Sequence, residues 1–403
     1  MNFVLLFFLT LAVLACFFRL YSPREVKLYF MYYVLSLTVL YTPAIFYTFE
    51  MGEEYRFFSE KSLATYQLLS TGIFILFFIA DCIADVICSK RHATVIDTNN
   101  DQPASKGLKI LFFFFATVLF VYILIHFDKF ALVKMLKTKS LPRRSDTTGE
   151  LPHWFSIYLL ITTIVPASYF YITRNKNLVR KIIGFFIVLC FLGIDANKGS
   201  IFLFIVYIAI FKFKKLISVK NVFLVFIGMG LYLFLMVGDF NLKNSENNLH
   251  LAGAFRRTFV TQGAGIPNRI EMKNNGYDWK HTRISKDVFE YVYGNDEGAY
   301  PTFFAIDIGI KWGWFCMYIV CMLISLSLAV LSKKILQYRP HDDVLRWLCT
   351  YLIFIISVSD MLHASNWIRY SYILTTMYLY VFFTRNRSTA QEPSQIPNQT
   401  ENI

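Results

Sequence analysis

The sequence predicts an all-α integral membrane protein with about 11 transmembrane helices. Of its 403 residues, 56% are hydrophobic and 18% are aromatic, and the apolar residues come in long runs. A helix needs about 20 mostly apolar residues to cross the hydrocarbon, because unpaired backbone groups are not tolerated in lipid. About eleven blocks approach this length, and a single long polar stretch, residues 239–300, interrupts them.

The predicted membrane helices follow one another through mostly short connections. The first has neither basic residues ahead of it nor a small-residue cleavage site, so we expect a retained helix and not a signal peptide. The sixth and seventh are short, and the ninth opens with Pro301, a residue suited to the first turn of a helix. The blocks span residues 3–18, 28–49, 66–88, 108–127, 153–172, 178–194, 200–211, 221–237, 301–331, 344–360 and 367–383.

These blocks divide the chain into four parts. Residues 1–238 hold the first eight membrane helices and a basic loop, 128–152, and residues 239–300 form the long polar loop. Residues 301–387 hold the last three membrane helices. The tail 388–403 is rich in Gln, Asn, Pro, Ser and Thr, a composition typical of disorder.

Composition also limits the classes of ligand. The net charge is +13, but most basic residues lie in connections between helices and not on one soluble domain, so we expect no nucleic-acid partner. The cysteines lie in or beside apolar blocks without metal-ligand spacing. There is no Asp-x-Asp pair and no Gly-rich phosphate loop ending in Lys-Ser or Lys-Thr. The sequence therefore predicts no metal, no cofactor and no ATP hydrolysis.

The basic residues also predict the orientation of the chain. Lys and Arg are enriched in cytoplasmic loops, and here they concentrate in alternate connections, beginning with the one after the first helix. This pattern places the N-terminus outside and the C-terminus inside. Two outer loops break the rule, residues 128–152 and 239–300, which suggests that their basic residues serve an anionic ligand. The alternative is that long loops translocate regardless of charge.

Each basic outer loop contains a candidate interfacial helix. Phe130, Val133 and Leu136 recur at helical spacing in the first loop. In the second loop, residues 251–259 form such a pattern, which we expect to end at Gly263, Gly265 and Pro267. Both helices are equally consistent with docking surfaces for the helix bundle. The basic residues of the two loops are Lys129, Lys134, Lys137, Lys139, Arg143 and Arg144, and Arg256, Arg257, Arg269, Lys273, Lys280, Arg283 and Lys286.

Polar residues near the predicted outer ends of the membrane helices add three features. Lys198 and Ser200 stand where the seventh helix begins, a plausible anion site or an ordinary hairpin with a solvated lysine. Asp307 lies about two turns into the ninth block, where an ionised group costs about 2.5 to 3.5 kcal/mol and needs a cavity or a partner. Lys311, one turn later, is the simplest partner. The last outer connection contributes Asp360, His363 and Arg369.

Asp81 and Asp85 stand one turn apart near the inner end of the third block. We interpret them as residues for helix packing or orientation.

These features together resemble a known family. The topology, the two basic outer loops and the stretch from Gly298 through Asp307 to Gly313 are similar to the Wzy-type O-antigen and oligosaccharide repeat-unit polymerases of bacteria. Members commonly carry a Gly-Ser-Arg-like turn at the position of Asn197, Lys198, Gly199 and Ser200. Lys198 stands where arginine is expected, and lysine binds phosphate as a point charge without the bidentate geometry of arginine.

The resemblance implies a fold, an activity and a location. The fold would be that of the polytopic C-type glycosyltransferases, in the inner membrane of bacteria. The activity would be metal-independent transfer of a glycan from its polyprenyl diphosphate carrier to the next carrier-linked repeat unit, on the outer face. Membrane lipids and a regulator of chain length would be further partners.

The same resemblance assigns roles to individual residues. Arginines stabilise the charge that develops on the departing diphosphate, and we expect Arg256 and Arg257 to do so as catalytic residues. A carboxylate accepts the proton of the acceptor hydroxyl, with Glu271 and Asp307 as the catalytic candidates beside Asp278 and Glu290. The diphosphate-binding candidates are Arg143, Arg144, Lys198, Arg269, Arg283 and Arg369.

Three other functions fit parts of the pattern. An O-antigen ligase would use the same donor, and a histidine in the long outer loop, such as His250 or His281, favours it. A transporter of the lipid-linked oligosaccharide usually shows repeated halves, and we find no internal repeat. A scaffold that binds anionic lipid headgroups is the least specific alternative.

Overall fold

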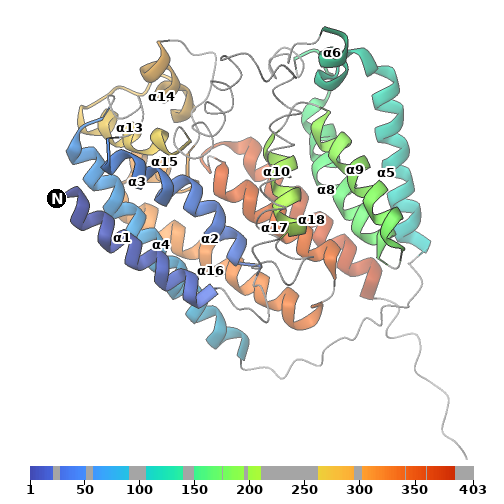
Figure 1. Ribbon diagram of the computed structural model, residues 1–403, viewed down its shortest axis with the longest axis horizontal. Helices are drawn as coiled ribbons and strands as arrows, with labels where there is room; N and C mark the ends of the chain where they lie inside the picture. Colours follow the sequence, from blue (N-terminus) through green and yellow to red (C-terminus); the bar gives the residue numbers. More distant parts are fainter. Residues whose placement is uncertain are drawn as a thin grey trace, which may run out of the picture.

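The computed structural model describes residues 1–20, 28–50, 58–89, 106–138, 149–174, 176–194, 198–209, 262–294, 302–340, 342–359 and 361–385. Throughout these ranges the regular elements are helices and there is no strand. The all-helical class is therefore confirmed for the described chain. Figure 1 shows most of the long helices packed side by side as a bundle.

The N-terminal part of the bundle is built on one long helix. α1 (Asn2–Leu20) packs against α4 (Glu60–Ser89), which is 30 residues long. Between them the chain forms α2 (Phe30–Ser36), a π-helical turn η1 (Leu37–Tyr41) and α3 (Thr42–Thr48), which continue as one apolar segment.

The middle of the chain forms a second group of helices. α5 (Lys106–Ile125) is followed by a 3-10 turn η3 (Phe127–Lys129) and the short α6 (Ala131–Thr138). α8 (Trp154–Thr173) packs on α5 and on α9 (Leu178–Gly193), and α10 (Lys198–Tyr207) follows. α6 lies in the first basic loop, so the helix expected there is confirmed, and Phe130 and Val133 are buried.

The C-terminal part joins the two groups. α13 (Gln262–Asn274), α14 (Ile284–Tyr293) and α15 (Ile306–Trp312) are short, and α16 (Trp314–Tyr338), α17 (Asp343–Val358) and α18 (Ala364–Arg385) are longer. α16 packs along α4, while α17 packs against α2, α8 and α18. The core is centred on α17, where Trp347 and Tyr351 are fully buried.

Within the described residues, six helical segments are long and apolar enough to cross a membrane, which indicates a membrane-embedded protein. They are Asn2–Leu20, Phe30–Thr48, Glu60–Ser89, Gly107–Ile125, Trp154–Thr173 and Trp314–Tyr338. α9 and α17 have 16 residues each, fewer than a straight crossing needs. The eighth predicted block, residues 221–237, lies outside the described residues. Eleven spans therefore remain a prediction.

Two expected helix boundaries are wrong. The ninth block is not one helix: Gly313 adopts φ 94° and ψ 156°, which ends α15 and starts α16 in a new direction. Gly263, Gly265 and Pro267 do not end a helix but lie inside α13. Glycine and proline disfavour a helix on their own, but tertiary packing overrides that preference, and α13 packs against α3, η1, α4 and α15.

The elements sort to two ends of the bundle. α6, α13 and α14 lie at one end in Figure 1, and the C-terminal ends of α1, α4 and α16 lie at the opposite one. The first end carries parts of both basic loops that we predicted to face outward. It is called the outer end below, and the opposite end the inner end.

Candidate functional site

α13 brings the long polar loop into direct contact with the membrane helices. Its residues Ala264, Ile266 and Ile270 are fully buried. A Cβ on Gly263 would come within 2.1 Å of Pro43 Cγ and 2.9 Å of the Val39 carbonyl oxygen. Glycine is therefore required where α13 begins, because only its bare backbone fits against η1 and α3.

Two of the predicted site residues form a buried ion pair. Arg269 of α13 and Asp307 of α15 both have fully buried side chains, and Nε of Arg269 lies 2.7 Å from Oδ1 of Asp307. Arg269 also donates from Nη1 to the Gly265 carbonyl oxygen at 2.7 Å. The expected pairing of Asp307 with Lys311 is therefore replaced by a contact between two separate helices. This geometry ties α13 to α15.

Lys273, one turn after Arg269, completes the contact between these helices. Its Nζ donates to the Gly309 carbonyl oxygen at 2.7 Å and lies 4.7 Å from the centre of the Trp314 ring. Burial lowers the pKa of Lys273. Such a cation over an aromatic face is a favourable contact, and it connects α13 to the start of α16.

Glu271 is held at the start of α4. Its Oε2 accepts hydrogen bonds from the backbone N–H of Ser59 at 2.9 Å and from the Ser59 hydroxyl at 2.6 Å, and its Oε1 accepts from Asn275. Burial raises the pKa of the Glu271 carboxyl, but the hydrogen bonds from Ser59, Ser62 and Asn275 outweigh this effect and lower the pKa to about 2. A carboxylate with this pKa is a weak base. The contacts favour an anchoring role over the proton transfer that we predicted for it.

The turn before α14 brings His281, Asp287 and Glu290 together. Their ligand atoms lie within 4.8 Å of one another, close enough to hold a metal ion. The existing contacts account for the cluster without one: Asp287 accepts from the backbone N–H groups of Lys280 and His281, and His281 Nε2 lies 3.2 Å from Glu290 Oε2. The cluster therefore orders the approach to α14.

Two further cations of the predicted site lie near the last outer connection. Nη2 of Arg283 is 3.5 Å from Nδ1 of His363. Arg369, at the start of α18, lies over the ring of Phe155 at 5.1 Å and over that of Tyr158 at 6.0 Å. The Tyr158 hydroxyl is 3.2 Å from that of Ser200. These contacts bring α8, α18 and the beginning of α10 together. That Arg369 and the Lys198–Ser200 turn bind a diphosphate remains a prediction.

Several predicted residues lie outside this description. Arg143, Arg144, Arg256, Arg257 and Asp360 fall in ranges that the structure does not describe, and of Lys198 only the backbone is described. In the first basic loop, Lys134 pairs with Glu150 at 2.8 Å and Lys137 pairs with Asp128. Acids in the same loop thus partly neutralise its charge.

Sequence reasoning did not find some of the contact residues. Phe155 and Tyr158 sit in an apolar block, and nothing in their spacing marks them as a platform for Arg369. Ser59 stands just ahead of α4, where a serine is a common helix cap. That position signals the start of a helix, but it does not reveal that the Glu271 carboxylate binds there.

No family model, no curated protein and no solved structure matches the chain.

Proposed function

We propose that the chain is a metal-independent glycosyltransferase that polymerises polyprenyl diphosphate-linked oligosaccharide repeat units at the outer face of the bacterial inner membrane. The product would be an O-antigen or a similar surface polysaccharide. The N-terminus then faces outward and the C-terminus faces the cytoplasm. No cofactor is required.

The observation that carries the proposal is the packing of α13 against α3, η1, α4 and α15 at the outer end of the bundle, with α14 packed on α13. This packing places Lys273 and Arg283 on the α13–α14 segment, and Arg283 contacts His363, six residues before Arg369. Two lipid-linked diphosphates need several cations close to the membrane surface. Arginine suits such groups because its donors form a fixed fork.

In the proposed reaction, a sugar hydroxyl of the acceptor attacks the anomeric carbon of the donor glycan. The bond from that carbon to the donor diphosphate breaks, and the diphosphate leaves with the electron pair. Cations placed around the diphosphate stabilise this developing charge. The proton of the hydroxyl passes to a carboxylate.

Accessibility distinguishes the four carboxylate candidates. Asp307 is fully buried against Arg269, and Glu271 is held by Ser59 and Asn275. The Glu290 side chain is 33% exposed, and Asp278 is exposed. Proton transfer to substrate therefore favours Asp278 or Glu290, whereas Asp307 and Glu271 serve to hold α13.

The test is reconstitution of the purified protein with a synthetic polyprenyl diphosphate-linked repeat unit of its host, without metal or nucleotide sugar. A ladder of products at multiples of the repeat supports a polymerase. Folded protein that yields no ladder with authentic substrate contradicts it. Glycan transferred to added lipid A core would mean a ligase, and substrate that crosses the bilayer unchanged would mean a transporter.

A variant pair connects the reaction to the site. Arg369→Ala removes a cation from the outer end and is expected to slow chain growth by about 10²- to 10³-fold if the guanidinium contacts the leaving group. The control is Lys334→Ala, an exposed lysine at the inner end of α16, which should leave the ladder unchanged. If both variants gave the same ladder of products, Arg369 would not be one of the residues that contact the leaving diphosphate.

A further inference from the structure

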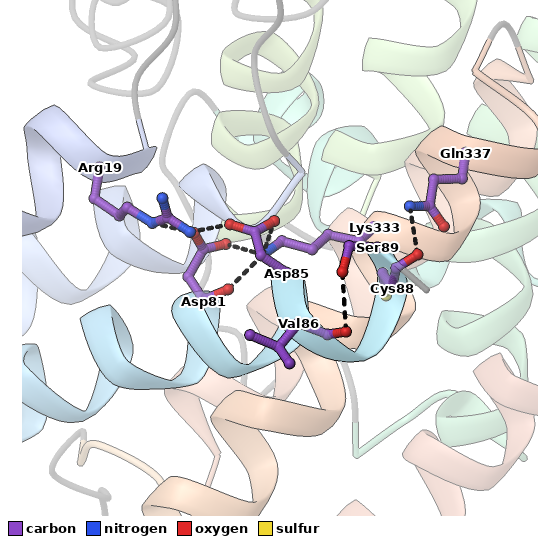
Figure 2. Close-up of polar contacts among 8 residues, drawn as sticks. All are labelled: Arg19, Asp81, Asp85, Val86, Cys88, Ser89, Lys333 and Gln337. Carbon is purple, nitrogen blue, oxygen red and sulfur yellow. Dashed lines mark hydrogen bonds and ion pairs between the residues drawn. The ribbon is translucent and has the colours of Figure 1, made fainter. Parts of the chain in front are cut away.

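Four charged side chains from three helices meet at the inner end of the bundle. They are Arg19 in the last turn of α1, Asp81 and Asp85 one turn apart on α4, and Lys333 on α16, and Figure 2 shows them converging. At 1.5 Å per residue, Asp81 and Lys333 each lie about 30 Å from the outer start of their helix. This distance is about the thickness of the hydrocarbon core. We call these four residues the inner quartet.

Each carboxylate of the inner quartet contacts both cations. Asp81 lies 2.8 Å from Arg19 and 2.9 Å from Lys333, and Asp85 lies 2.7 Å from Lys333 and also contacts Arg19. Lys333 donates in addition to the backbone carbonyl of Asp81. The Asp81 side chain is fully buried and that of Lys333 is 9% exposed, whereas Arg19 and Asp85 are 30% and 47% exposed. The charges of the four groups balance.

Stability alone does not explain such a group. Burying ions costs free energy that their mutual attraction often only offsets, so apolar side chains of similar size would hold the helices together about as well. The best-attested use of buried polar groups between helices is to fix their register. Apolar helices in lipid have no hydrophobic force that selects one register over another.

Two of the three helices joined by the inner quartet, α4 and α16, also contact α13 at the opposite end. The start of α4 binds Glu271 through Ser59, and the start of α16 contacts Lys273 through Trp314. Between these two ends α4 and α16 pack closely, with Gly72 against Tyr318. A shift of one helical turn is about 5.4 Å, enough to separate both outer contacts.

We propose that the inner quartet sets the register of α1, α4 and α16, and that Asp81 and Lys333 thereby act as positioning residues for α13 and the Arg269–Asp307 pair. The inner quartet and the outer contacts are joined by rigid helices, so a change at one end reaches the other. The proposal stands whether or not the chain is a polymerase, because it concerns the packing of α13.

The test compares Lys333→Met with Lys334→Met, a matched change at the neighbouring exposed lysine. Backbone amide exchange is followed for residues 262–274 and, as an internal reference, for α8, which packs on α5, α9 and α17. We expect Lys333→Met to speed exchange in residues 262–274 by about tenfold while α8 changes little. Lys334→Met should resemble the unchanged protein.

A second variant keeps the test decisive if Lys333→Met does not fold. Asp81→Asn with Lys333→Met removes one charge of each sign and leaves Arg19 with Asp85, so no uncompensated charge stays buried. We expect this double variant to fold with the stability of the unchanged protein and still to exchange faster in residues 262–274. Unchanged exchange in α13 of the folded double variant, or an equal rise in α8, would overturn the register role.

Discussion

At the scale of single residues, the Arg269–Asp307 pair explains how a charged segment comes to lie inside an apolar bundle. Both side chains are fully buried. Either charge alone would be very costly there, because ions lose their hydration in a medium of low dielectric. Pairing offsets the free-energy cost of burying the two charges. The packing of α13 therefore depends on α15, and that of α15 depends on α13.

This dependence predicts a non-additive effect of mutation. Asp307→Asn leaves the Arg269 charge uncompensated and should lower the free energy of unfolding by about 3 to 5 kcal/mol. Arg269→Met combined with Asp307→Leu should cost clearly less than either single change. Thermal unfolding in detergent measures both, with the exposed Lys311→Met as control. Additive losses in the double variant would contradict the pairing.

Glu271 predicts a dependence on acidity. Its folded-state pKa of about 2 lies below the ordinary value of 4.5, with burial opposing the shift and the Ser59, Ser62 and Asn275 donors outweighing it. A carboxyl with a lowered pKa stabilises the fold above its ordinary pKa and loses that contribution as pH falls toward the folded value. The melting temperature should therefore drop between about pH 4.5 and pH 2.

Glu271→Gln is the matched variant for this acid-dependent loss. The neutral amide has no such titration, so its melting temperature should fall less over the same range. It should also start from a lower value at neutral pH, since the charged acceptor is gone. Parallel curves for the two proteins would show that Glu271 does not titrate as the contacts require.

At the scale of elements, α13 is the part that sequence reasoning interpreted least well. Its glycines and Pro267 are usual signals for the end of a helix, and they predicted a break where the chain is helical. The reason for the helix lies in residues far away in sequence, because Gly263 is needed for contact with Pro43 and Val39. A local pattern holds no information about that contact.

Gly263→Ala tests whether this close approach holds α13. The added methyl meets Pro43 at 2.1 Å, so we expect a loss of about 1 to 3 kcal/mol in the free energy of unfolding. Gly107→Ala, an exposed helical position on α5, should instead be neutral or slightly stabilising, as alanine favours helices over glycine. A Gly263→Ala protein as stable as the Gly107→Ala protein would mean that α13 sits elsewhere.

Other elements were predictable, and for a physical reason. The long apolar blocks became helices because lipid allows few other ways to satisfy a backbone. The amphipathic pattern around Phe130 likewise became α6. The break at Gly313 was missed although Trp312 and Trp314 flank it, and tryptophan is enriched where a helix meets the membrane surface. Contacts such as that of Arg369 with the Phe155 ring depend on tertiary packing, so the spacing of residues along the sequence does not predict them.

At the scale of the whole molecule, the two ends of the bundle differ in how they use charge. The inner quartet is balanced and compact, whereas the outer end exposes Arg283, Asp278 and Lys280 in the connection between α13 and α14. The orientation inferred from basic residues requires the second group to face away from the cytoplasm. That orientation is a property of the entire chain and is measured independently of any activity.

Labelling of one introduced cysteine at a time tests the orientation. In intact cells, a membrane-impermeant maleimide should label Asp278→Cys and leave Lys334→Cys unlabelled until the membrane is opened. Both positions are exposed, so the difference reports the side of the membrane. The unchanged protein gives the background from its own seven cysteines. Labelling with the opposite preference would invert the topology and move the proposed site to the cytoplasm.

The surface of η1, α3 and α4 that α13 packs on also determines when the protein can finish folding during synthesis. η1, α3 and the start of α4 are made about 200 residues before α13, and a ribosome adds about 5 to 20 residues per second. For about 10 to 40 seconds the surface that receives Gly263 therefore has no native occupant. That surface therefore reaches its native packing only after the second half of the chain has been made.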